Sequence, residues 1–104
     1  MAAVDLSAKP TGFSSATVMW SIPSVAYTPE MYTVIYGTNR RDLSRRSDVI
    51  AGIPNATHYA IELMQLEHNT RYYYKVQSNN TVGSTESDTH HFDIKDASEY
   101  TEHF

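Results

Sequence analysis

Hydrophobic and polar residues alternate with a period of two along four stretches of the chain. Aromatic or aliphatic residues take every second position in residues 16–21, 31–36, 58–63 and 72–77. Side chains two apart on a strand point the same way, so each stretch predicts a strand with one face toward a core. β-Branched and aromatic residues, which suit half-buried strands, are concentrated there. No stretch has the 3.6-residue period of a helix.

Weaker strand patterns occur at residues 4–8, 48–51 and 89–94, and turn-forming residues separate all of these stretches. About seven short strands with frequent turns predict an all-β fold, a single antiparallel sandwich over residues 1–94. Residues 95–104 are polar and acidic and predict a tail or linker. The inward positions predict a core of Leu6, Ala16, Val18, Trp20, Tyr32, Val34, Tyr36, Tyr59, Ile61, Leu63, Leu66, Tyr72, Tyr74, Val76 and Phe92.

Composition narrows the classes of function that remain open. The chain has 104 residues and no cysteine, which excludes thiolate catalysis and cysteine-ligated metals. Its formal net charge of -4 argues against non-specific binding to nucleic acid, which relies on clustered positive charge. No apolar run approaches the roughly 20 residues of a membrane helix, so we expect no membrane contact by this segment.

One tryptophan and several tyrosines recur at ordered spacings. Trp20 closes its strand pattern and precedes Ile22, and a Tyr-x-Val-x-Tyr pattern begins at Tyr32. Further along the chain, the residues that carry the spacing are Leu66, Thr70, Tyr72, Val76, Asn80, Gly83 and Ser87. In this order, residues 4–94 resemble a fibronectin type III domain.

The resemblance implies a seven-stranded immunoglobulin-like sandwich, with three strands packed on four. It makes Trp20, Leu66 and Tyr72 structural residues, and Tyr72 the centre of a tyrosine corner whose hydroxyl bonds to the backbone upstream. His68 stands where the family often has proline, and Ser78 where it usually has a small apolar residue. The lack of cysteine argues against a disulfide-bonded immunoglobulin domain.

No constellation of residues points to catalysis or to a bound cofactor. The nucleophile elbow, the glycine-rich phosphate loop and the His-Glu-x-x-His zinc motif are all missing from the sequence. His90 and His91 are adjacent, so on a strand they point to opposite faces and cannot hold one metal together. We therefore expect neither a catalytic residue, nor a metal site, nor a cofactor.

An outward face and a basic loop are the candidate binding regions. If the strands at 31–36 and 72–77 are neighbours, as the resemblance implies, their outward residues share one face suited to a protein ligand. These residues are Met31, Thr33, Ile35, Tyr73, Lys75 and Gln77. Four arginines in the connection that follows the first of these strands suggest binding of an acidic glycan, although a solvated loop is the simpler interpretation. They are Arg40, Arg41, Arg45 and Arg46.

Two glycosylation sequons lie at predicted turns and favour an extracellular setting. They begin at Asn55 and Asn79. The leading hypothesis is a non-catalytic module of a receptor, adhesion or matrix protein, a spacer and protein-binding surface at the cell surface or outside the cell. One alternative is an intracellular scaffold module, as in giant muscle proteins. Another is an accessory domain of a receptor phosphatase or another multidomain enzyme.

Overall fold

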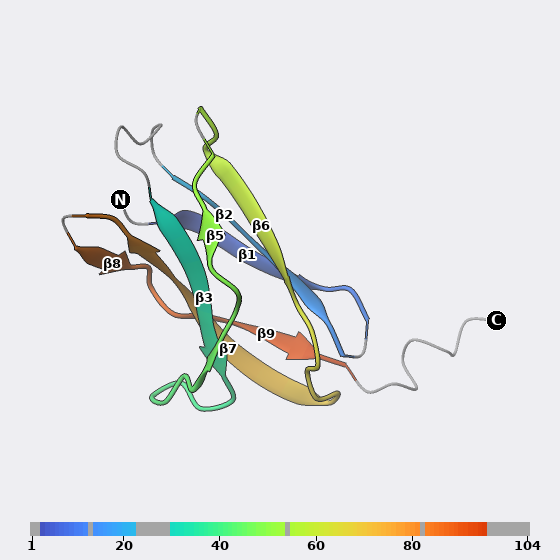
Figure 1. Ribbon diagram of the computed structural model, residues 1–104. Helices are drawn as coiled ribbons and strands as arrows, with labels where there is room; N and C mark the ends of the chain where they lie inside the picture. Colours follow the sequence, from blue (N-terminus) through green and yellow to red (C-terminus); the bar gives the residue numbers. More distant parts are fainter. Residues whose placement is uncertain (1–2, 13, 23–29, 54, 82, 96–104) are drawn as a thin grey trace.

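The alternating stretches of sequence form antiparallel strands in the computed structural model, which describes residues 3–12, 14–22, 30–53, 55–81 and 83–95 (Figure 1). Most of the predicted tail lies outside these residues. The strands are β1 Val4–Pro10, β2 Ala16–Ser21, β3 Met31–Gly37, β4 Arg45–Arg46, β5 Ile50–Ala51, β6 His58–Leu63, β7 Thr70–Asn79, β8 Ser84–Glu86 and β9 His90–Ile94.

Two sheets make up the sandwich. One has the strand order β1-β2-β6, and the other is built around the central pair β3 and β7. Both β4 and β5 pair with β3, and both β8 and β9 pair with β7. Within the described residues, the nine segments therefore correspond to seven strands, two of them interrupted. The predicted packing of three strands on four is confirmed.

Aromatic side chains fill the space between the sheets. Trp20 stacks on Tyr59 at 6.0 Å between ring centroids, and Tyr72 stacks on Phe92 at 5.7 Å. Leu6 and Ile61 are only partly buried, because they lie on the edge strands β1 and β6. The remaining predicted core residues are buried, and among the described residues the core cluster also contains Ala3, Ile22 and Ile94, which the alternation missed.

The tyrosine corner forms as the resemblance implied. The backbone N–H of Glu67 donates a hydrogen bond of 2.8 Å to the hydroxyl of Tyr72. Leu66, just before it, is buried, and its N–H donates to the carbonyl of Ser14 at 2.9 Å. The turn before β7 is therefore held by Tyr72 on the core side and by the connection between β1 and β2.

Both edges of the β3–β7 sheet are broken by a serine. Ser47 lies between β4 and β5, and its hydroxyl accepts the N–H of Val34 at 2.9 Å while its own N–H donates to the Val34 carbonyl. Ser87 lies between β8 and β9 and bonds to Val76 in the same two ways. Each serine hydroxyl also donates to the carbonyl of the next residue at 3.0 Å. A side chain thus replaces a backbone acceptor at both breaks.

A third irregularity interrupts β1. Val4 pairs with Ser21, but the register shifts before Ser7 pairs with Met19. Asp5 occupies this bulge with a φ of 54°, in the left-handed region that few non-glycine residues adopt. One strand of the first sheet is thereby divided into two separately paired parts.

Candidate interaction surface

The predicted outward face exists, but two of its six residues are covered. Met31 is 48% exposed, and Tyr73, Lys75 and Gln77 are half-buried. Thr33 and Ile35 are buried at 4% exposure, so the prediction that they offer surface to a partner is wrong. Ile35 lies between its cross-strand neighbours Arg46 and Lys75, and such long side chains cover the apolar residue between them.

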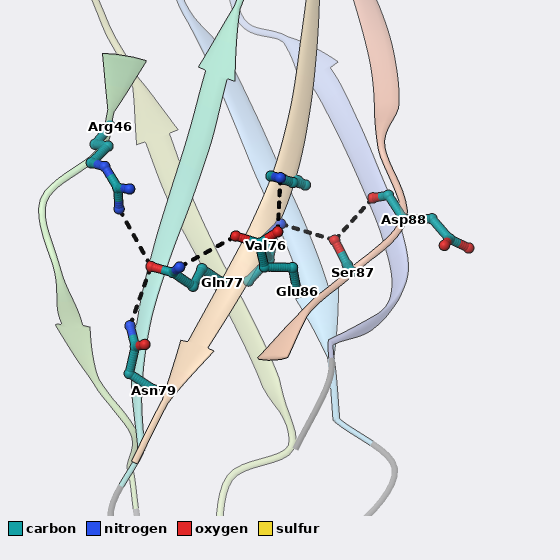
Figure 2. Close-up of polar contacts among 8 residues, drawn as sticks. Arg46, Val76, Gln77, Asn79, Glu86, Ser87 and Asp88 are labelled. Carbon is teal, nitrogen blue, oxygen red and sulfur yellow. Dashed lines mark hydrogen bonds and ion pairs between the residues drawn. The ribbon is translucent and has the colours of Figure 1, made fainter. Parts of the chain in front are cut away.

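Gln77 links the side chains of this face into a hydrogen-bonded chain (Figure 2). Its amide oxygen accepts from Arg46 at 3.3 Å and from Asn79 at 3.4 Å. Its amide nitrogen donates to Glu86 at 3.3 Å, and Glu86 also accepts from Lys75 at 2.8 Å. Residues from β4, β7 and β8 are thereby held in a common arrangement.

Tyr73 continues the face toward β9. Its ring lies 6.1 Å from that of His91, the residue opposite it in the ladder. Beyond them, the guanidinium of Arg71 donates two hydrogen bonds to Asp93, at 2.7 and 3.2 Å. These bonds hold the pKa of Asp93 below its usual range. The aromatic residue therefore stands between two ion pairs, Arg71–Asp93 and Lys75–Glu86.

The four arginines do not form one free cluster. Arg45 and Arg46 were expected in a connection, but they form β4 and pair with β3. The Arg45 guanidinium carbon lies 4.9 Å from the centre of the Tyr36 ring, and Arg46 bonds to Gln77. Arg40 and Arg41 are exposed in the turn between β3 and β4. Binding of an acidic glycan at this turn stays a prediction.

The two sequons occupy different surroundings. Asn55 is an exposed turn residue with a φ of 67°. Asn79 was also predicted at a turn, but it is the last residue of β7, where it pairs with Met31 and Ser84. It is half-buried, and its side-chain amide donates to Gln77. Asn55 is therefore the better placed of the two to carry a glycan in solvent.

A hollow on the opposite sheet was not predicted from the sequence. It lies on the outer side of β1, β2 and β6 and has a volume of about 430 Å³. Asp5 lines it and accepts a 3.3 Å hydrogen bond from the hydroxyl of Ser21. The alternation indicates which β2 residues face outward, but the bulge that brings Asp5 there has no signal in the pattern. The lining residues are Asp5, Ser7, Met19, Trp20, Ser21, His58, Tyr59 and Ala60.

A buried polar cluster near the start of β3 was also missed. The hydroxyl of Tyr32 donates to the carboxylate of Glu30 at 2.8 Å, and the amide of Asn80 donates to the same carboxylate at 3.5 Å. Burial and the bond to Glu30 raise the pKa of Tyr32. These groups bond to one another and so stabilise the end of the sandwich.

Metal-ligating side chains do not converge within the described residues, where no group of three histidines or carboxylates comes together. The same part of the chain contains no helix that is long and apolar enough to cross a membrane.

Comparison with known proteins gives a family and a set of similar structures. The family model for the fibronectin type III domain matches residues 2–93. The chain is similar to the FN1–FN3 domains of chicken CNTN1, with 23% identity and a TM-score of 0.71, covering 92% of this chain and 32% of that one. It is also similar to the fn3 domain of human contactin 1, with 19% identity, a TM-score of 0.70 and coverage of 91% and 77%.

The FN5 domain of Drosophila Lar gives 14% identity and a TM-score of 0.58, covering 91% of this chain and 96% of that domain. At these identities the structural likeness shows the fold. The chain spans about a third of the chicken fragment. No curated protein matches the sequence.

Proposed function

This chain belongs to the fibronectin type III family, and we propose that it is a non-catalytic module of an extracellular or cell-surface protein. In this proposal it binds a protein ligand through the outer face of β3 and β7 and acts as a spacer between neighbouring domains. The observation that carries the proposal is the ordered row of side chains on that face, from Met31 through Gln77 and Lys75 to Tyr73.

Two properties make this face suitable for a protein ligand. Tyrosine and methionine are enriched at protein interfaces, and Tyr73 and Met31 flank a polar centre. The hydrogen bonds among Arg46, Gln77 and Glu86 already hold their side chains, so binding a partner costs less conformational entropy. The face therefore combines apolar contact with pre-ordered polar groups.

The spacer role is supported by where the strands begin and end. β1 starts and β9 finishes at opposite ends of the sandwich (Figure 1). A chain that enters at one end and leaves at the other separates the domains on either side. The similar chicken fragment carries FN1–FN3 domains in one chain, in line with such an arrangement.

An extracellular setting is supported by the sequon at Asn55, whose side chain is exposed at a turn. The test is secretion of the chain from eukaryotic cells, with intact mass measured before and after enzymatic removal of N-glycans. We expect wild type and Asn79→Gln to lose glycan mass and Asn55→Gln to lose much less. A folded, secreted and unmodified wild-type chain would instead favour the intracellular scaffold.

The ligand-binding face is tested with the immobilised domain and proteins extracted from extracellular matrix. Tyr73→Ala is expected to weaken capture of a specific protein by about tenfold or more, as removal of a central interface aromatic does. Met19→Ala, an exposed site on the opposite sheet, serves as the matched control. Capture reduced equally by both substitutions, or by neither, would contradict a site at Tyr73.

A further inference from the structure

The edge formed by β5 differs chemically from every other edge that the structure describes. Val49, Ala51 and Ile53 lie at alternate positions along it, all exposed, whereas Ile50 packs toward the core. Val49 is 58% exposed and Ile53 62%. Met31, exposed at 48%, is the ladder partner of Ala51, so four apolar side chains share this side of the sheet.

The remaining edges carry charge, and so does this edge just before its apolar stretch, at Arg45, Arg46 and Asp48. Within their described residues, β1 contains Asp5 and Lys9, β6 contains Glu62, β8 contains Glu86 and β9 contains Asp93. Charged side chains on an edge strand discourage pairing with another chain, because pairing would remove them from water. Residues 49–53 have no charged side chain.

Hydrogen-bonding groups of this edge point away from β3. Gly52 donates to the carbonyl of Glu30 at 2.7 Å, which places Gly52, and two residues before it Ile50, in the hydrogen-bonded positions of the antiparallel ladder. The alternate residues, Val49 and Ala51, therefore direct their N–H and C=O groups outward. No strand pairs with β5 on that side among the described residues.

We propose that this edge pairs with the same edge of a second copy of the chain, antiparallel about a two-fold axis at Ile50. In this register Val49 lies opposite Ala51 of the second copy, and the two pairs exchange four backbone hydrogen bonds. A register centred on Ala51 would use Ile53, whose N–H and C=O already bond to Tyr59 and Ala56. The axis at Ile50 is therefore favoured.

The side chains that would meet across the junction of the two copies are compatible with this pairing. Val49 of one copy packs beside Ala51 and Met31 of the other, extending the apolar row across the junction. Asp48 lies opposite Gly52, so like charges do not meet. The pairing surface lies at β5 and not at Tyr73, so this inference does not depend on the proposed ligand-binding face.

Sedimentation analysis of the pure chain from about 10 μM to about 1 mM tests the dimer. We expect reversible dimerisation, and we expect Val49→Lys to weaken it by about tenfold or more. Met64→Lys places the same charge at another exposed apolar site, 55% exposed, and is expected to leave it unchanged. A chain that stays monomeric throughout, or equal effects of the two substitutions, would overturn the proposal.

Cysteine cross-linking tests the register, since the natural chain has no cysteine. Val49 and the opposite Ala51 have Cα atoms roughly 5.5 Å apart in such a ladder, within reach of a disulfide. A mixture of Val49→Cys and Ala51→Cys chains should form a cross-linked heterodimer much faster than either chain alone forms a homodimer. Cross-linking of Val49→Cys alone at the rate of the mixture would overturn the axis at Ile50.

Discussion

The two edges of the β3–β7 sheet are both broken at a serine with the same backbone arrangement. They differ in the side chains of the residues that follow the serine. At Ser47 and at Ser87 a serine leaves the ladder, and its hydroxyl takes over a hydrogen bond from the central strand. An aspartate follows each serine, Asp48 or Asp88, and past Asp48 the edge has no charged side chain from Val49 to Ile53. Beyond Ser87 it carries His90, His91 and Asp93. Side-chain chemistry, rather than the break, thus distinguishes the edge able to accept a second chain.

The similarity of the breaks has its origin in the centre of the sheet. Val34 and Val76 are ladder partners, both fully buried, and each has its N–H satisfied by one of the two serines. Buried backbone donors without a partner are costly, so each edge has to supply an acceptor at this level. Serine does so while the edge strand bends away.

Removal of both hydroxyls is expected to give the largest loss of stability. Ser47→Ala and Ser87→Ala each leave a buried N–H without its acceptor, which costs about 1–3 kcal/mol. The double variant should lose roughly the sum, measured by urea unfolding. Ser84→Ala, exposed on β8, is the control and should change little. A marked difference between the single variants would show that the edges are not equivalent.

Alkaline pH is expected to lower the free energy of unfolding through the next row of inward-facing residues in the same sheet. There Tyr36 and Tyr74 are partners, flanked by Arg45 on β4 and His90 on β9. Burial raises the pKa of Tyr74 to about 12. The unfolded chain therefore loses this proton first, and the free energy of unfolding should fall as pH rises from about 10 to about 12.

Tyr74 is expected to contribute up to about 3 kcal/mol to this fall in the free energy of unfolding. The contribution is measured by comparing thermal unfolding of wild type and Tyr74→Phe across this pH range. The variant should lose less stability than wild type between the two ends of the range. An unchanged alkaline loss in Tyr74→Phe would assign the effect to other groups, such as Tyr32.

A smaller effect of opposite sign is expected at Ser78. This residue lies on β7 between Tyr32 and Thr85, and its hydroxyl is buried with no hydrogen-bond partner among the described residues. Ser78→Ala removes that unsatisfied group and should stabilise the chain by about 1 kcal/mol in urea unfolding. Ser21→Ala, which removes a hydroxyl that donates to Asp5, should bring no such gain.

Period-two alternation was enough to predict most of the strands, a sandwich and most of the core, but residues 45–46 and 84–86, which form β4 and β8, were expected in connections. It succeeds because inward positions such as Val18, Tyr32 and Tyr74 repeat at the spacing of a strand. It assigned Ile35 to an exposed face, since alternation separates the two sides of a sheet but does not show whether neighbours such as Arg46 cover a side.

The irregular features of the strands could not be predicted from the alternation of hydrophobic and polar residues. Nothing in the spacing of polar residues marks Ser47 and Ser87 as the points where edge strands leave the ladder, because many serines occur in exposed positions. The β1 bulge depends on the backbone of one residue, Asp5, and the hollow beside it depends on the bulge. The candidate face was therefore predictable in outline, whereas its covered residues and its hydrogen bonds were not.

The bulge at Asp5 also determines how the domain responds to tension between its ends. A continuous antiparallel strand pulled along its length resists through many bonds loaded together. In β1 the pairing of Val4 with Ser21 stands apart from the pairing that runs from Ser7 to Pro10. Under a stretching force the first part should detach alone, lengthening the chain by a few residues while the sandwich stays folded.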